Sequence, residues 1–232
     1  MTGNGTSPIE LAVLDIAGTT VQEHGLVYEA LLDAVRDGGA QAAPADIAPW
    51  MGADKREAVR ALLTKHGSER PSEEDVERVH DDFRMRLGDA YARRPPAPYP
   101  GVPEALERLR GAGVRIALST GFDRAVADPL LDSIGWPGDL IDTVVCADEV
   151  GQGRPAPYMI FRAMETAGVR DVARVLVAGD TVLDLQAGTN AGAGLVVGVL
   201  TGGVSPSVLG AVRHTHLLPG VAQLPSLLHG TD

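Results

Sequence analysis

Short apolar runs alternate with amphipathic segments through the second half of the chain. The runs are rich in Val, Ile, Leu and Ala, which is typical of strands buried on both faces of a parallel sheet. Apolar residues in the intervening segments recur at helical spacing. The pattern predicts strands at 9–14, 114–118, 143–146, 174–178 and 195–199, and helices near 102–111, 124–134, 156–167, 184–191 and 221–228. We therefore expect an α/β fold, a doubly wound parallel sheet of five or more strands with helical crossovers.

Between the first strand and this alternating region, the pattern is helical. Helices are predicted at 26–37, 53–66 and 72–92. Residues 21–25 form one linker, and the proline-rich stretch 93–100, RRPPAPYP, allows neither a helix nor a central strand to continue. We therefore predict an α/β core domain of residues 1–20 and 98–232, with an all-helical cap domain of residues 21–97 inserted into it.

Composition and charge narrow the functional class. The chain has 232 residues and a formal net charge of −11, which argues against a nucleic-acid or anionic-membrane surface. An anionic ligand must then be held by local donors. Cys146 is the single cysteine, so no intrachain disulfide can form, as is usual in a reducing cytoplasm. Because no long apolar run or secretory segment is present, we expect a soluble cytoplasmic protein.

Polar side chains stand at the ends of four predicted strands or in the loops that follow them. They are Asp15, Ser119, Thr120, Arg154, Asp180 and Asp184. Each alone has an ordinary interpretation as a helix cap or a solvated loop charge. Together they supply a nucleophile, hydroxyl donors, a cation and carboxylates for a divalent metal at the sheet edge where α/β proteins bind ligands. This set suits phosphoryl transfer, in which positioning and charge neutralisation matter most.

The four blocks LDIAGTT, LSTG, GRPAP and GDTVLD, in this order and with a helical insert after the first, resemble those of the haloacid dehalogenase-like hydrolases. The resemblance implies a Rossmann-like core in which Asp15 attacks phosphorus to form an aspartyl-phosphate. Arg154 would neutralise the charge between Asp15 and the phosphate and pair with Asp184. The implied Mg²⁺ site comprises Asp15, the carbonyl of Ala17, Asp180 and Asp184, and the implied phosphate-binding residues are Ala17, Gly18, Thr19, Ser119, Thr120 and Gly121.

One position departs from most phosphatases of this superfamily. They carry a second aspartate two residues after the nucleophile, which serves as general acid and base, whereas this chain has Ala17. A methyl group can neither protonate a leaving group nor deprotonate water. Either another group, such as Glu23 or His24 in the linker, replaces it, or the leaving group needs no such help. The ordinary interpretation of Glu23 and His24, which their place in the linker favours, is that of solvated residues.

Lys55 lies on the apolar stripe of its predicted helix, together with Ala58, Val59 and Leu62. A lysine on this face can be desolvated in a cap–core crevice, which would lower its pKa and expose a neutral amine able to form a Schiff base. The alternative is a lysine whose amine reaches out to solvent from the edge of the stripe. Periodicity alone leaves both open.

The combination of DIAGTT with MGADKREAVRALL resembles the phosphonatase (phosphonoacetaldehyde hydrolase) branch of the superfamily. The resemblance implies that Lys55 is the cap lysine that condenses with the substrate aldehyde, and that Met51 precedes it as a substrate-binding residue. Two positions differ, because that branch has a histidine where this chain has Ala58 and a tyrosine where it has Phe122. Both losses remove acid–base groups.

Three functions remain open from the sequence. The first is a Mg²⁺-dependent hydrolase that cleaves the carbon–phosphorus bond of phosphonoacetaldehyde or a related carbonyl phosphonate. The second is a phosphate monoesterase, similar to phosphoglycolate phosphatase, acting on a small phosphorylated metabolite. The third is a non-catalytic phosphate-binding module. A homodimer through Leu26, Leu31 and Leu32 of the first cap helix is also conceivable, although a buried cap core explains these leucines more simply.

Overall fold

The computed structural model describes residues 9–67, 70–137 and 139–228, so the ends of the predicted core domain, 1–8 and 229–232, lie outside it. Among these residues, six parallel strands form one sheet in the order β5-β4-β1-β6-β7-β8, which confirms the predicted fold class. The strands are β1 (Leu11–Asp15), β4 (Arg115–Thr120), β5 (Thr143–Cys146), β6 (Val175–Gly179), β7 (Leu195–Val199) and β8 (His216–Leu218).

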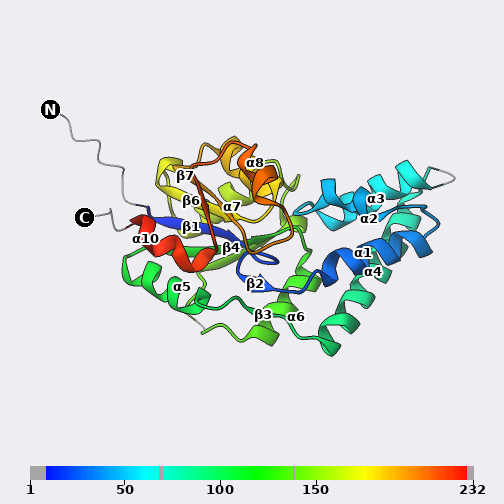
Figure 1. Ribbon diagram of the computed structural model, residues 1–232, viewed down its shortest axis with the longest axis horizontal. Helices are drawn as coiled ribbons and strands as arrows, with labels where there is room; N and C mark the ends of the chain where they lie inside the picture. The colour runs from blue at the N-terminus through cyan, green and yellow to red at the C-terminus, as the bar shows by residue number, and fades with distance from the viewer. Residues whose placement is uncertain (1–8, 68–69, 138, 229–232) are drawn as a thin grey trace.

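Helices cover both faces of the sheet (Figure 1). They are α5 (Val102–Gly111), α6 (Arg124–Ile134) and α10 (Leu224–Leu228) on one face, and α7 (Tyr158–Ala167) and α8 (Val182–Ala191) on the other. Strand β1 shows why its sequence is apolar throughout: Ala12 and Leu14 pack toward α5, whereas Leu11 and Val13 pack toward α7. Its alternating side chains therefore enter two hydrophobic layers, as expected for the centre of a parallel sheet.

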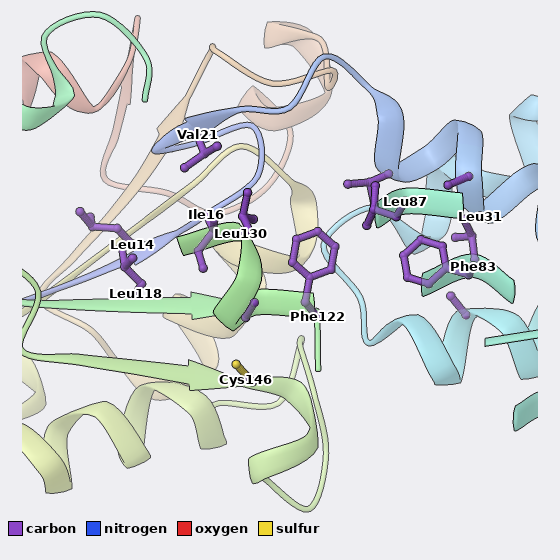
Figure 2. Packing of buried hydrophobic residues seen from close by; sticks show 14 of the residues in the cluster. Leu14, Ile16, Val21, Leu31, Phe83, Leu87, Leu118, Phe122, Leu130 and Cys146 are labelled. Atoms are coloured by element: carbon purple, nitrogen blue, oxygen red, sulfur yellow. The ribbon is translucent and has the colours of Figure 1, made fainter. Parts of the chain in front are cut away.

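The inserted helices lie to one side of the sheet (Figure 1). They are α1 (Leu26–Asp37), α2 (Pro44–Ile47), α3 (Lys55–His66) and α4 (Glu73–Arg93). Helix α1 packs against α3 and α4, and Leu31, Phe83 and Leu87 come together there (Figure 2). Leu31 and Leu32 are thus buried within the cap rather than displayed on it. The homodimer and the division into two domains stay predictions.

Two linkers join this insert to the core, and they pair with each other. Strand β2 (Val21–Gln22) runs antiparallel to β3 (Ala97–Pro98). The sequence did not predict this ribbon, since two-residue strands leave no periodic pattern and one of them contains a proline. The ribbon brings the two chain crossings together, so the insert is attached to the core at one place.

The remaining differences from the predicted elements concern short segments. The short elements that were not predicted are α2, α9 (Pro206–Gly210), β8 and the 3-10 helices η1 (Ala48–Trp50), η2 (Ala147–Glu149) and η3 (Val172–Arg174). The expected last helix is divided into η4 (Val221–Gln223) and α10. Such segments are too short to show a period. Within the described part of the chain, no helix combines the length and the apolar character that crossing a membrane requires.

Candidate active site

Asp15 is the last residue of β1, in the middle of the sheet. Its register partner on β4 is Ser119, and Asp180 follows directly after β6, the neighbour on the other side. Because all three strands are parallel, their carboxyl ends meet at one edge. The structure therefore brings together the polar side chains that the sequence placed after separate strands.

Arg154 links three of these groups. Its Nη1 lies 2.7 Å from Asp15 Oδ1, its Nη2 donates to Ser119 Oγ at 2.7 Å, and its Nε lies 2.9 Å from Asp184 Oδ1. The arginine is buried, so these charge-assisted contacts are strong. Arg154 thus contacts both the proposed nucleophile and a second carboxylate.

Burial raises the pKa of Asp15 to about 7, against the opposing effect of the Arg154 charge. Asp180 is also buried, and burial together with the Asp15 and Asp184 charges keeps its pKa well above the usual range. Carboxylates in such a site repel one another. A cation placed among them would relieve this repulsion.

The carboxylates fit a divalent metal. Oxygen atoms of Asp15, Asp180 and Asp184 all lie within 4.8 Å of one another, and carboxylate oxygens are the ligands that Mg²⁺ prefers. The chain around Asp180 leaves no space for side chains: a Cβ at Gly18 would lie 2.6 Å from Asp180 Oδ2, and one at Gly202 would lie 1.8 Å from it. These glycines allow the backbone to surround the Asp180 carboxylate.

Asp184 differs from the other two carboxylates because both its oxygens are engaged. Oδ1 contacts Arg154, and Oδ2 accepts from the backbone nitrogen of Thr181 at 3.0 Å and from its hydroxyl at 2.6 Å. These bonds form the capping box of α8. The geometry suits Asp184 for holding Arg154, while its direct coordination of a metal, like that by the Ala17 carbonyl, stays a prediction.

The predicted phosphate-binding residues divide into two groups. Ser119 Oγ accepts from Arg154, which leaves the serine O–H available to donate to a phosphoryl oxygen. The Thr19 hydroxyl is engaged as a donor, since it donates to Asp180 at 2.8 Å, whereas the Thr120 hydroxyl accepts from the Phe122 nitrogen at 3.1 Å. Their direct contact with phosphate stays a prediction.

The loop before α3 lies directly on the core edge. The backbone nitrogen of Lys55 donates to the Gly121 carbonyl at 3.2 Å, and the Gly52 carbonyl accepts from Arg154 Nη1 at 3.3 Å. Met51 also approaches the core, with its Cε 3.2 Å from where a Cβ at Gly203 would stand. The predicted cap residues Met51 and Lys55 therefore sit against the strand ends that carry Asp15 and Ser119.

This contact depends on the missing side chain of Gly121. A Cβ there would lie 2.2 Å from the Ala53 carbonyl oxygen, which belongs to backbone and cannot swing away. We expect Gly121→Ala to displace the Lys55 loop and lower kcat/KM on the order of 10²-fold, the usual cost of misplacing a reacting group by about 1 Å. Steady-state kinetics measures the effect. Gly88→Ala, in an open stretch of α4, is the matched control and should leave the rate unchanged.

Lys55 is 4% exposed, so its amine does not reach out to solvent as the alternative interpretation required. Its Nζ donates to the Ala53 carbonyl at 2.6 Å and lies 5.6 Å from the centroid of the Phe122 ring and 6.0 Å from that of Tyr28. Burial lowers the pKa of Lys55 to about 8, although the Asp15 charge acts in the opposite direction. At pH 7 roughly a tenth of such amines are neutral and able to attack a carbonyl.

The same burial gives a pH-dependent prediction for stability. Below pH 8 Lys55 is charged in both the folded and the unfolded chain, and its pKa shift from 10.5 to about 8 destabilises the fold by about 3 kcal/mol. Between pH 8 and 10.5 the unfolded chain binds more protons, so this cost disappears as the pH rises. We expect Lys55→Met to raise the free energy of unfolding at pH 7 by about this amount, measured by urea denaturation in chelator, and to lose the advantage near pH 11. An equal advantage at both pH values would contradict the assignment.

Two residues near the site behave differently from the sequence interpretation or were missed by it. Glu23 is buried, and its carboxylate oxygens accept from the backbone nitrogens of Gly25 and Val27, each at 2.9 Å. It is therefore neither solvated nor available as the replacement acid, because it caps α1. Tyr28 was not predicted as a site residue, since only the packing of α1 against α3 places its ring near Lys55. No sequence signal identified it.

Comparison with known proteins agrees with this geometry. The chain matches the haloacid dehalogenase-like hydrolase family over residues 9–192. It therefore belongs to this family and is a hydrolase of the haloacid dehalogenase superfamily. Within the family, it is 31% identical over 207 residues to a phosphonoacetaldehyde hydrolase-like protein of Syntrophobacter fumaroxidans, covering 84% of this chain and 74% of the relative.

Two further proteins show the same similarity. The phosphonoacetaldehyde hydrolase of Nitratidesulfovibrio vulgaris is 33% identical over 207 residues, which are 84% of this chain and 73% of that protein. The solved structure of a phosphonoacetaldehyde hydrolase-like protein from Oleispira antarctica superposes with a TM-score of 0.81 at 22% identity, covering 99% of this chain and 95% of that one. At this identity the structure shows a shared fold.

Proposed function

We propose that the protein is a Mg²⁺-dependent phosphonatase-like hydrolase that cleaves the carbon–phosphorus bond of phosphonoacetaldehyde or a related carbonyl phosphonate. The observation that carries the proposal is the buried Lys55 amine, on a segment that lies directly against the core edge bearing Asp15 and Arg154. A desolvated lysine of lowered pKa suits imine formation, whereas a lysine that only balances phosphate charge would serve equally well when fully protonated. Two relatives that each share 84% of the chain are named phosphonoacetaldehyde hydrolase and phosphonoacetaldehyde hydrolase-like protein, which supports the same choice.

Lys55 carries out the first half of the reaction, which prepares the carbon–phosphorus bond for cleavage. Its neutral amine condenses with the substrate aldehyde, releasing water and forming a protonated imine. The imine withdraws electrons from the adjacent carbon–phosphorus bond. When that bond breaks, its electron pair moves into the carbon chain and gives an enamine, which later takes a proton and is hydrolysed to acetaldehyde.

Residues at the carboxyl edge of the core sheet carry out the second half, which is the transfer of the phosphoryl group. Asp15 attacks phosphorus as the carbon–phosphorus bond breaks, and water then hydrolyses the aspartyl-phosphate. Arg154, fixed by Asp184, balances charge on Asp15 and the phosphoryl group, while the Ser119 hydroxyl donates to a phosphoryl oxygen. This route explains Ala17, because an imine that accepts the electron pair removes the need to protonate an alkoxide leaving group.

Asp15 and Asp180 are the residues that would hold Mg²⁺, with Asp184 supporting them through Arg154. The ion, when bound, supplies positive charge that lets an anionic phosphonate approach the Asp15 carboxylate. The surrounding chain carries a net charge of −11, so this local charge matters more than any global field.

Turnover of defined substrates tests the proposal. The protein is incubated with phosphonoacetaldehyde, 2-phosphoglycolate and p-nitrophenyl phosphate, each with Mg²⁺ or with excess chelator. We expect equal amounts of acetaldehyde and phosphate from phosphonoacetaldehyde, only with Mg²⁺. Release of phosphate from the two esters alone would replace this proposal with the monoesterase. No release from any of the three would favour the phosphate-binding module.

A further inference from the structure

Two aromatic rings flank the Lys55 amine, and only one of them carries a hydroxyl. The Phe122 ring centroid lies 5.6 Å from Lys55 Nζ, and the Tyr28 ring centroid lies 6.0 Å from it. Phe122 comes from the core, after β4, and lies between the core and cap hydrophobic groups in Figure 2. Tyr28 comes from α1 in the cap. The amine therefore lies near one ring from the core and one phenol ring from the cap.

The phenol of Tyr28 keeps its proton. Burial raises the pKa of Tyr28 well above its usual value, and the charges of Asp180, Asp15 and Glu23 act in the same direction. Tyr28 also borders a pocket of about 270 Å³ with the apolar side chains of Leu32, Ile47 and Met51. Its ring therefore has the lysine near it and open space beside it.

Among the described residues, the other acid–base groups near the amine have another role or a partner: Asp15 is the proposed nucleophile, and Asp54 accepts from the Glu57 nitrogen as the N-cap of α3. Ala17 and Ala58 carry only methyl groups, the oxygens of Glu23 cap α1, and the three nitrogens of the Arg154 guanidinium are all held. Imine formation nevertheless requires proton transfer to and from the substrate oxygen. The phenol is the group whose chemistry and place fit that requirement.

We propose that Tyr28 transfers protons between the Lys55 nitrogen and the substrate carbonyl oxygen, a role that rests on the imine chemistry proposed above. The neutral amine forms the carbon–nitrogen bond as the carbonyl π electrons move to oxygen, which takes the phenol proton. The resulting phenolate removes one proton from the now cationic nitrogen. The products are a neutral carbinolamine and an unchanged Tyr28, so the step needs no further reactant.

The experiment measures how fast Lys55 is labelled rather than whether it can be labelled. Protein and saturating phosphonoacetaldehyde are mixed, and samples are reduced with borohydride at increasing times. Tyr28→Phe keeps the ring and removes the hydroxyl, and we expect it to slow labelling on the order of 10²-fold, the lower range for loss of an acid–base group. Tyr91→Phe, which removes another buried cap hydroxyl, is the control and should label at the wild-type rate.

Moving the phenol hydroxyl from Tyr28 to position 122 distinguishes loss of the proton-transfer group from a change in packing. In the double variant Tyr28→Phe/Phe122→Tyr, the other ring beside the amine carries the hydroxyl. We expect this variant to label Lys55 at least about tenfold faster than Tyr28→Phe does. Labelling of Tyr28→Phe at the wild-type rate would overturn the role of Tyr28 while leaving the imine mechanism intact. Failure of the wild-type protein to label at Lys55 would overturn the mechanism and with it this role.

Discussion

Asp15→Asn is expected to reduce turnover by at least about 10⁴-fold, the usual scale when a covalent nucleophile is removed. The amide has the size of the carboxylate but cannot attack phosphorus, and it removes a negative charge from the proposed Mg²⁺ site. Arg154 would still contact Ser119 and Asp184, so the rest of the array has its partners. The loss should therefore appear in kcat rather than in the folded fraction.

Steady-state phosphate release and the thermal midpoint of unfolding, measured on the same preparation, check this. Asp128→Asn, which changes an exposed aspartate on α6, is the matched control and should keep full activity. Turnover in Asp15→Asn within tenfold of wild type would show that another group attacks phosphorus. The nucleophile would then have to be sought outside the β1 edge.

Lys55→Arg is expected to lower acetaldehyde release by at least about 10³-fold. Guanidinium stays charged at any accessible pH and cannot condense with an aldehyde. Because arginine keeps a positive charge near Asp15 at pH 7, a difference between Lys55→Arg and the wild-type protein cannot come from lost charge. Lys65→Arg at the other end of α3, where the side chain is exposed beside Asp46, serves as control.

The competing monoesterase gives a different pattern for the same variant. If Lys55 only balances charge, Lys55→Arg should retain much of the phosphate release from 2-phosphoglycolate and p-nitrophenyl phosphate. Loss of acetaldehyde release together with retained binding of inorganic phosphate would locate the defect in imine formation. Unchanged acetaldehyde release would exclude the lysine from the chemistry.

The sequence predicted those features of the fold and the site that follow from the spacing of apolar residues in strands and helices. A continuous apolar run in a parallel sheet must end at the carboxyl edge, so Asp15, Ser119 and Asp180 could be expected to meet there before any coordinates were known. The helical stripe on α3 placed Lys55 on the apolar face but left open whether its amine reaches solvent, and the structure buries the residue. In each case local periodicity determines which way a side chain points.

The rest depends on how separate segments approach one another. The β2–β3 ribbon, the close contact of Gly121 with Ala53 and the position of Tyr28 near Lys55 all arise between segments distant in the chain. Glu23 was misjudged for the same reason, because its role in capping α1 depends on a turn around His24, whose φ is 65°. A pattern of hydrophobic spacing carries no information about such contacts.

Reductive trapping of the substrate on Lys55 tests the central claim most directly. The wild-type protein is incubated with phosphonoacetaldehyde and borohydride, digested with a protease, and its peptides are weighed by mass spectrometry. The proposed mechanism predicts a reduced adduct on the peptide that contains Lys55, dependent on the aldehyde and missing from Lys55→Arg. Unmodified Lys55 in a protein that still releases phosphate from phosphonoacetaldehyde would contradict it.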